Sequence, residues 1–318
     1  MEIFTNTNVD FIGKRKVAFI VSLVIISLGI ISLIVHGGPR LSIDFEGGLQ
    51  LQFRFEKPVD IAEIRRILAE TGHPSAEIQM FGAETEVLIR IKGTEGTTET
   101  EEGKNPLVHE IQEAFAEAFP DNPAIIDRQE QVGPKVGQEL KGQALLAILY
   151  SMIGIILYIW WRFEFKFGAA AVIALFHDVV ITIGVFSLID HEISLTIIAA
   201  LLTIVGYSLN DTIVVFDRIR ENLRNMRRKE YSEIINASIN QTLSRTLLTS
   251  GTTFLVVLSL IILGGSVIQD FGIALLVGIV VGTYSSIFVA SPMLVEWQAR
   301  QEANQKAKVR TNVKRKKK

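Results

Sequence analysis

Six long runs of apolar residues, joined by short polar stretches and one long polar segment, set the pattern of this 318-residue chain. A helix that crosses the hydrocarbon core of a bilayer needs about 20 predominantly apolar residues. Each run is long enough to do so. The runs cover residues 17–35, 141–161, 167–189, 193–216, 246–264 and 271–295. The pattern therefore predicts a polytopic α-helical membrane protein with six transmembrane helices.

The long polar segment, residues 36–139, has the periodicity of a folded domain rather than of a loop. Residues 49–55 ("LQLQFRF") alternate apolar and polar positions, as a half-buried strand does. Periodicity and capping residues predict helices at 60–72 and 105–119, and further strands at 76–81, 86–91 and 124–133. The order β-α-β-β-α-β is that of ferredoxin-like folds. An α+β domain is thus expected between the first and second transmembrane helices.

Two polar stretches lie outside the predicted spans and outside the predicted helices and strands of the domain. Residues 92–105 ("KGTEGTTETEEGKN") contain no apolar side chain and predict a mobile loop. Residues 231–250 have apolar positions at helical spacing. They fit either an interfacial helix that leads into the fifth span or a solvated connector, and the pattern leaves both open.

Charge distribution predicts the orientation of the chain. The net charge of −2 divides into −10 for residues 36–139 and +8 for the rest. Lysine and arginine near helix ends stay on the cytoplasmic side of a membrane. The basic residues before the first span, between spans two and three, after span four and at the end of the chain all obey this rule if both termini are cytoplasmic.

This orientation gives a domain plan. Residues 1–35 form a cytoplasmic N-terminus and the first span, which is too long and too poor in cleavage signals for a signal peptide. Residues 36–139 form the external domain, 140–296 hold spans two to six, and 297–318 form a basic cytoplasmic tail. We interpret the tail as an orientation signal with a disordered end. The expected location is the cell's inner membrane.

Composition excludes several classes of protein. Hydrophobic residues make up 48% of the chain, and the mean hydropathy is +0.34. The chain has no cysteine and only five histidines, none paired at zinc-ligand spacing. It contains no P-loop, nucleophile elbow or HExxH motif. We therefore expect no enzyme activity, no cofactor or metal, and no nucleic-acid partner.

A carboxylate interrupts the fourth apolar run. Asp211 follows Asn210 a few residues from the cytoplasmic end, and Arg245 opens the fifth run at similar depth. An intramembrane Asp costs about 2.5–3.5 kcal/mol on insertion scales and marks a functional site by default. Asp211 is thus expected to handle a proton or ion, with Arg245 as a switching partner. The alternative is a static polar clamp; for Arg245 alone, a side chain that snorkels to the headgroups is favoured.

Two further polar residues lie in the third run. His177 and Asp178 are near its middle and should face the bundle interior. They fit a buried polar relay or a simple packing contact equally well. In the last run, Gly278, Gly282 and Ser286 have the small-xxx-small spacing that lets helices approach closely.

Five motifs resemble the SecF family of protein-export membrane proteins. They are "SIDFEGG" after the first span, "VGPKVGQEL" before the second, "HDV" in the third, "GYSLNDTIVVFDRIREN" in the fourth and "SRTLLTSGTT" at the fifth. The resemblance covers residues 4–297. By motif match, the family's proton-coupling acid falls on Asp211, its functional arginine on Arg245, and its glycine-rich motif on Asp44, Phe45, Gly47 and Gly48.

The resemblance implies a partner and a task. The chain would pair with SecD, resemble half of a resistance-nodulation-division transporter, and work beside SecYEG, YajC and YidC in membrane lipid. It would use the proton-motive force to assist exported preproteins late in translocation, after the SecA ATPase has acted. Two rival hypotheses are a proton-coupled exporter of small molecules or lipids, and a passive assembly factor. The rivals differ in whether Asp211→Asn is tolerated.

Overall fold

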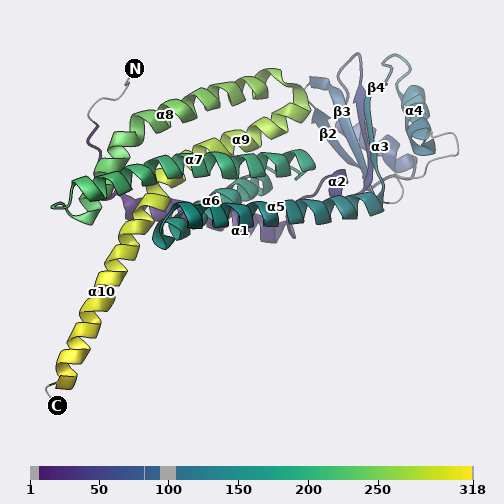
Figure 1. Ribbon diagram of the computed structural model, residues 1–318. Coiled ribbons are helices and arrows are strands. Elements are labelled where there is room, and N and C mark those ends of the chain that lie inside the picture. The colour runs from purple at the N-terminus through teal and green to yellow at the C-terminus, as the bar shows by residue number, and fades with distance from the viewer. Residues whose placement is uncertain (1–6, 82, 94–104, 317–318) are drawn as a thin grey trace.

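The computed structural model describes residues 7–81, 83–93 and 105–316 (Figure 1). Within these ranges six helices are long and apolar enough to cross a membrane, which confirms the predicted number. The helices are α1 (Arg15–Val35), α5 (Pro134–Arg162), α6 (Phe165–Leu188), α7 (Leu195–Asn225), α8 (Tyr231–Leu263) and α9 (Gly265–Ser285). The last continues through a π-helical turn, η2 (Ser286–Ala290), into α10 (Ser291–Lys316).

The six helices divide into an inner and an outer group. About half of the apolar window is buried in α6, in α7 and in the last span, but only 22% in α1, 17% in α8 and 11% in α5. The small α+β domain lies at one end of this bundle, and α10 leaves it at the other end (Figure 1). The inner group therefore forms the core, and the outer helices present apolar faces to their surroundings.

The domain between α1 and α5 has the predicted ferredoxin-like topology. Its elements are β1 (Gly48–Arg54), α3 (Ile61–Glu70), β2 (Glu77–Phe81), β3 (Ala83–Lys92), α4 (Pro106–Ala118) and β4 (Ile125–Val132). The strands form one antiparallel sheet in the order β2-β3-β1-β4. Alternate residues of β1, Leu49, Leu51 and Phe53, are fully buried against α3 and α4, as the period of two predicts.

Local signals explain where the domain's helices begin and end. The side chain of Asp60 accepts a hydrogen bond from the backbone N–H of Ala62 and starts α3. Asn105 does the same for Leu107 ahead of Pro106 in α4. Gly72, with φ of +88°, follows the end of α3 in the left-handed region where glycine is favoured. These boundaries lie within two residues of those predicted from the sequence.

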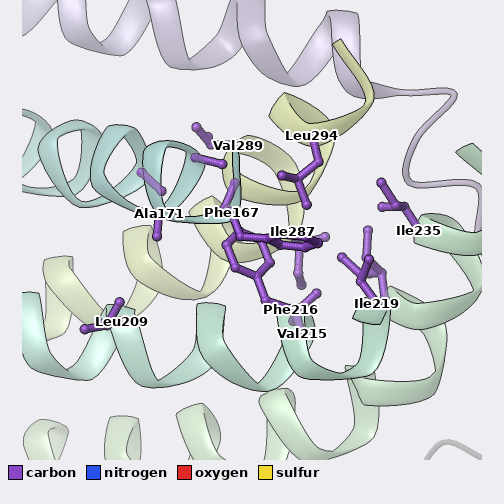
Figure 2. Packing of buried hydrophobic residues seen from close by; sticks show 14 of the residues in the cluster. Phe167, Ala171, Leu209, Val215, Phe216, Ile219, Ile235, Ile287, Val289 and Leu294 are labelled. Carbon is purple, nitrogen blue, oxygen red and sulfur yellow. The ribbon is translucent and has the colours of Figure 1, made fainter. Parts of the chain in front are cut away.

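Interlocked aromatic and aliphatic side chains hold the bundle together near α10 (Figure 2). The rings of Phe167 in α6 and Phe216 in α7 meet edge-on with centroids 5.2 Å apart. Ile287 of the π-helical turn and Leu294 of α10 pack into the same cluster (Figure 2). The cluster therefore joins α6, α7 and the last span.

The structure bears on two expectations about polar stretches and adds one element. Residues 231–250 are part of one continuous helix, α8, as the helical alternative predicts, and Ile235 and Ile239 are buried in the bundle's core cluster. The tail was expected to have a disordered end, but α10 runs to Lys316, because its only proline, Pro292, lies in the first turn and helix formers follow it. A short helix, α2 (Ile43–Glu46), was not foreseen. The loop expected at 92–105 lies mostly outside the described residues.

Candidate functional site

The glycine-rich motif turns the chain sharply between α2 and β1. Gly47 has φ of +76° and Gly48 φ of +139°, a region that other residues rarely adopt. A Cβ at Gly47 would lie 2.8 Å from Cα of Pro134, and one at Gly48 would lie 2.4 Å from the carbonyl oxygen of Ile91. Only glycine fits both positions, so the motif lets α2 pack directly against the start of α5.

The other two motif residues attach this turn to α7. Asp44 Oδ2 accepts a hydrogen bond of 2.9 Å from the backbone N–H of Leu195, the first residue of α7. Phe45 is buried in a cluster that includes Ile197 and Leu201 of the same helix. Carboxylates at a helix N-terminus are favoured by the helix dipole and its free N–H groups. The external domain thus caps the helix that carries Asp211.

Asp211 is buried where α7, α8 and α9 meet. Its residue is only 2% exposed. Its Oδ2 accepts a hydrogen bond of 3.2 Å from Ser250 Oγ of α8, and Thr283 Oγ1 of α9 donates to that serine at 2.7 Å. The carboxylate therefore faces neighbouring helices, as its cost in lipid predicts.

The expected partners of Asp211 point elsewhere. Asn210 and Arg245 are both exposed at the surface of the bundle, and no ion pair joins Arg245 to Asp211. Arg245 lies close enough to act on Asp211 through its charge alone. Arg245 and Ser250 are five residues apart, so they lie about 140° apart around α8. Because Ser250 faces Asp211, Arg245 cannot face it as well in this conformation.

His177 and Asp178 join four helices. Asp178 Oδ1 is 2.8 Å from His177 Nδ1, while its Oδ2 accepts hydrogen bonds from Ser208 Oγ of α7 at 2.5 Å and Ser285 Oγ of α9 at 2.8 Å. His177 Nε2 is 3.0 Å from Ser22 Oγ of α1. Every charged or polar atom of this pair has a partner, as a buried network requires.

Hydroxyl side chains are the part of the site that sequence reasoning missed. Ser208, Ser250, Thr283 and Ser285 contact the two carboxylates or each other, yet each is a residue that also packs tightly between helices. Ser208 precedes Asp211 by one helical turn, and this spacing was the available signal. The small residues of α9 act as predicted: Cβ atoms at Gly278 and Gly282 would meet α7 at 2.3 and 3.0 Å.

Hydroxyl groups surround both buried acids. Ser208, which donates to Asp178, lies on α7 one helical turn before Asp211, and a hydroxyl can both accept and donate a proton. The π-helical turn follows Ser285 directly, with Ser291 Oγ donating to the carbonyl of Ser286 at 2.8 Å. π-Helical turns often occur at functional sites, where they change the register of a helix. The buried acids thus lie beside a segment with irregular geometry.

Comparison with protein families defines the class. A family model described as "Protein export membrane protein SecD/SecF, C-terminal" matches residues 111–300, and a "SecD/SecF GG Motif" model matches residues 32–59. The second match covers the turn at Gly47 and Gly48 and the cap at Asp44. A bundle of six spans with this capped helix is thus that of a protein-export membrane protein.

Individual relatives narrow the assignment. Protein translocase subunit SecF of Desulfurispirillum indicum is 49% identical over 92% of both chains, and that of Calditerrivibrio nitroreducens is 46% identical over 92% of this chain and 96% of its own. The chain belongs to the SecF family of protein translocase subunits. The crystal structure of SecDF, a translocon-associated membrane protein from Thermus thermophilus, matches 92% of the chain with a TM-score of 0.82 and 40% identity. The chain spans 39% of that protein's length.

Proposed function

We propose that this chain is a non-enzymatic, proton-coupled subunit of the Sec export machinery, in which protonation of Asp211 moves the external domain. SecF relatives act in protein translocation, and membership of the family carries that general role to this chain. One observation supports the specific mechanism: Asp211 lies on α7, and the first N–H of α7 is capped by Asp44 of the external domain. A change in the position of α7 would therefore reach the domain directly.

Protonation would change how α7 packs. A neutral Asp211 is accommodated by the hydroxyl of Ser250, which in turn accepts from Thr283, whereas an ionised Asp211 needs a nearby positive charge. Arg245 could supply that charge if α8 rotated, since it is on the same helix as Ser250. Alternation between these two partners would couple proton transfer to helix movement. His177 and Asp178 would pass protons along the same side of α7 through Ser208.

A second subunit is expected to cover one face of the bundle. Asn210 and Arg245 are exposed beside apolar surface of α8, including Leu255 and Val256. Polar side chains directed at lipid are costly, so a protein surface should cover them. We propose that SecD is this partner in a heterodimer, since the matching SecDF chain is more than twice as long. SecYEG, YajC and YidC, exported preproteins and lipid complete the proposed partners.

We also propose that the domain is external and both termini are cytoplasmic. In this plan residues 1–35 and 297–318 start and end inside, 36–139 lie outside and 140–296 hold the remaining spans of an inner-membrane protein. The N-terminal segment is held on α8 by hydrogen bonds from Asn236 and Asn240 to the carbonyl of Val9. This contact and α10 lie at the end of the bundle remote from the sheet, in keeping with a shared side for both termini (Figure 1).

The test uses inverted membrane vesicles that contain the chain and its partner, with export of a preprotein measured with and without a proton gradient. Asp211→Asn keeps size and hydrogen bonding but cannot release a proton, so gradient-dependent stimulation should be lost while ATP-driven translocation is largely spared. Arg245→Met should have the same effect, and Asp211→Glu should keep part of the activity. Glu221→Gln, an exposed acid of α7, is the matched control. If Asp211→Asn vesicles respond fully to the gradient, Asp211 does not couple protons, and its role is that of a static polar contact between helices.

A further inference from the structure

A cluster of five charged residues joins the external domain to the bundle. Glu192, in the loop between α6 and α7, faces Arg40 of the segment after α1 and Glu77, Arg90 and Lys92 of strands β2 and β3. We call these residues the outer charge cluster. The side chain of Glu192 is only 7% exposed, although it belongs to a loop. A buried acid at a domain junction requires a physical reason.

The acids of the cluster share their cations unequally. Glu77 Oε2 lies 2.8 Å from Arg40 Nη2, and Glu77 Oε1 lies 3.1 Å from Lys92 Nζ. Glu192 Oε1 is farther from the same two atoms, at 3.9 and 4.0 Å. The nearest cation of Glu192 is Arg90, whose Nη1 is 3.0 Å from Oε2.

Hydrogen bonding at Glu192 is incomplete without a proton. Neither of its buried oxygens accepts a hydrogen bond from the surrounding described groups, because the Arg90 contact has the distance of an ion pair but not the geometry of a hydrogen bond. Its carboxyl group lies close to that of Glu77, because oxygens of both acids lie within 4.0 Å of Arg40 Nη2 and of Lys92 Nζ. Two carboxyl groups in contact are stable when they share one proton, which then supplies the missing donor.

We propose that Glu192 and Glu77 form a proton-binding site that fastens the external domain to the start of α7. The proton bridges an acid of the sheet and an acid of the α6–α7 loop, and its loss leaves two carboxylates in contact. This site is separate from Asp211, and the proposal stands or falls without the proton-coupled function proposed above.

Electrostatics support a proton at this position near neutral pH. Burial is the main cause that raises the pKa of Glu192 to about 7, and the contact with Glu77 adds to it while Arg90 and Lys92 oppose it. Burial acts to raise the pKa of Glu77 as well, but the hydrogen-bonding contact with Glu192 and the cations Lys92 and Arg40 lower it overall. The pair therefore titrates as a unit that holds its proton mainly on Glu192.

Water can reach the site through a polar cleft between the sheet and the bundle. The cleft has a volume of about 140 Å³, and Glu192 and Arg90 line it together with Asp270 of α9. Other charged groups near the cluster have partners of their own: Asp190 pairs with Arg40, Glu46 with Lys92 and Arg128 with Glu130. Asp270 lies 3.4 Å from His191, which pairs with it when that histidine is protonated. These pairs leave the two glutamates as the like charges in contact. The proton would enter from the side on which the domain lies.

Protonation of the Glu192–Glu77 pair would affect the start of α7. Ile193, next to Glu192, donates its N–H to the carbonyl of Arg40 at 2.7 Å and accepts from the N–H of Ser42 at 3.1 Å. Leu195 begins α7 two residues later, held by Asp44. Repulsion between the two carboxylates would therefore strain the segment that joins the domain to the helix.

The direction of the pH effect follows from the pKa of Glu192. A pKa that is higher in the docked state than the usual 4.5 means that docking binds a proton. The contribution to docking is complete below about pH 4.5 and is lost as pH rises through about 7. The pKa of Glu77 is lowered, so the contribution of Glu77 to docking is lost only when the pH falls below the ordinary 4.5 of a glutamate. Docking should therefore weaken between mildly acidic and alkaline pH.

The experiment measures docking directly in the full-length chain. The sequence has no cysteine, so Ala69→Cys in α3 and Gln269→Cys in α9 provide two unique, exposed positions for spin labels. Distances between the labels are measured by pulsed electron paramagnetic resonance in lipid nanodiscs from pH 5.5 to 8.5. We expect a narrow docked distance at low pH and a second, broader population at high pH. One bound proton limits the change in the docking constant to about tenfold per pH unit.

Variants identify the groups that titrate. Glu192→Gln mimics the protonated acid and should stay docked at every pH. Glu77→Gln should shift the midpoint to lower pH, because it removes a charge that raises the pKa of Glu192. Glu117→Gln, an exposed acid of α4, should behave as wild type. A wild-type distance that does not change with pH, or a response that persists in Glu192→Gln, overturns the proposal. If Glu192→Gln fails to fold, an unchanged midpoint in Glu77→Gln overturns it instead.

Discussion

At the scale of single residues, the glycine-rich turn combines positive φ angles with close backbone contacts. Gly48 combines a positive φ with a carbonyl 2.4 Å from the position of its absent Cβ. We expect Gly48→Ala to destabilise the chain by about 1–3 kcal/mol, the cost of a strained backbone position. The thermal unfolding midpoint of the purified chain measures this. Gly133→Ala is the control, because its φ is −67° and open space surrounds its Cβ; equal effects of the two changes would contradict this account.

Asp178 gives a second prediction at this scale. It accepts from two serine hydroxyls and contacts His177, all inside the bundle. Asp178→Asn removes the charge and turns the oxygen that faces His177 into a donor, so the histidine must change its tautomer or lose this partner, at about 1–3 kcal/mol. Urea unfolding should show this loss, and Ser285→Ala, which removes one donor and keeps the acid, should cost less. A variant Asp178→Asn that is as stable as wild type would contradict the need for an acceptor that faces His177.

The sequence predicted that Asp178 and Asp211 are buried, but it did not predict which residues they contact. An acid inside an apolar run must face other helices, and this placed Asp211 and Asp178 correctly in the interior. Which side of α8 faces Asp211 depends on the rotation of one helix against another. Hydropathy carries no signal for that rotation, since Ser250 and Arg245 are both polar. The direct hydrogen-bond partner of Asp211 is a serine. Arg245, which the sequence offered as a possible partner but favoured as a side chain directed outward, is exposed.

At the scale of elements, the N-terminus of α7 is capped both by its neighbour in sequence and by a residue of the external domain. Asp44 and Ser194 both accept from N–H groups of its first turn. Asp44→Ala should destabilise this turn by about 1 kcal/mol, as loss of a cap does. Hydrogen exchange at Leu195 should become faster, while Asp44→Asn, which keeps an acceptor, should change it less. Unchanged exchange in Asp44→Ala would show that Ser194 alone caps the helix.

Elements with a clear period were predictable, and those fixed by tertiary contact were not. The strands and helices of the external domain follow from alternation, helical spacing and capping residues such as Asp60 and Asn105. The four-residue helix α2 has too few positions to show a period, and the contact of Phe45 with α7 holds it in place. Similarly, polar residues 231–245 continue α8 because their apolar side packs on the bundle.

At the scale of the whole molecule, the proposed orientation places the basic segments on one side of the membrane. The acidic segment 36–139 contains the sheet, whereas the basic segments gather at the opposite end of the bundle (Figure 1). There Arg15 at the start of α1 pairs with Glu296 in α10 at 2.9 Å, and Arg162 at the end of α5 pairs with Asp217 in α7 at 2.8 Å. These ion pairs join α1 to α10 and α5 to α7.

This orientation predicts the activity of fused reporters. A reporter that works only in the cytoplasm should be active when fused after Lys229, between α7 and α8, or after Lys318, and inactive after Asn122 in the external domain. A reporter that works only outside the cytoplasm should give the reverse pattern at the same three positions and serves as the control. The physical reason is that Lys and Arg resist transfer across the membrane during insertion. Replacing Arg227, Arg228 and Lys229 with glutamine should therefore lower the activity of the cytoplasmic reporter fused after residue 229. The same reporter fused after Asn122 should stay inactive. A cytoplasmic signal after Asn122 would reverse the orientation and, with it, the side from which protons reach Glu192.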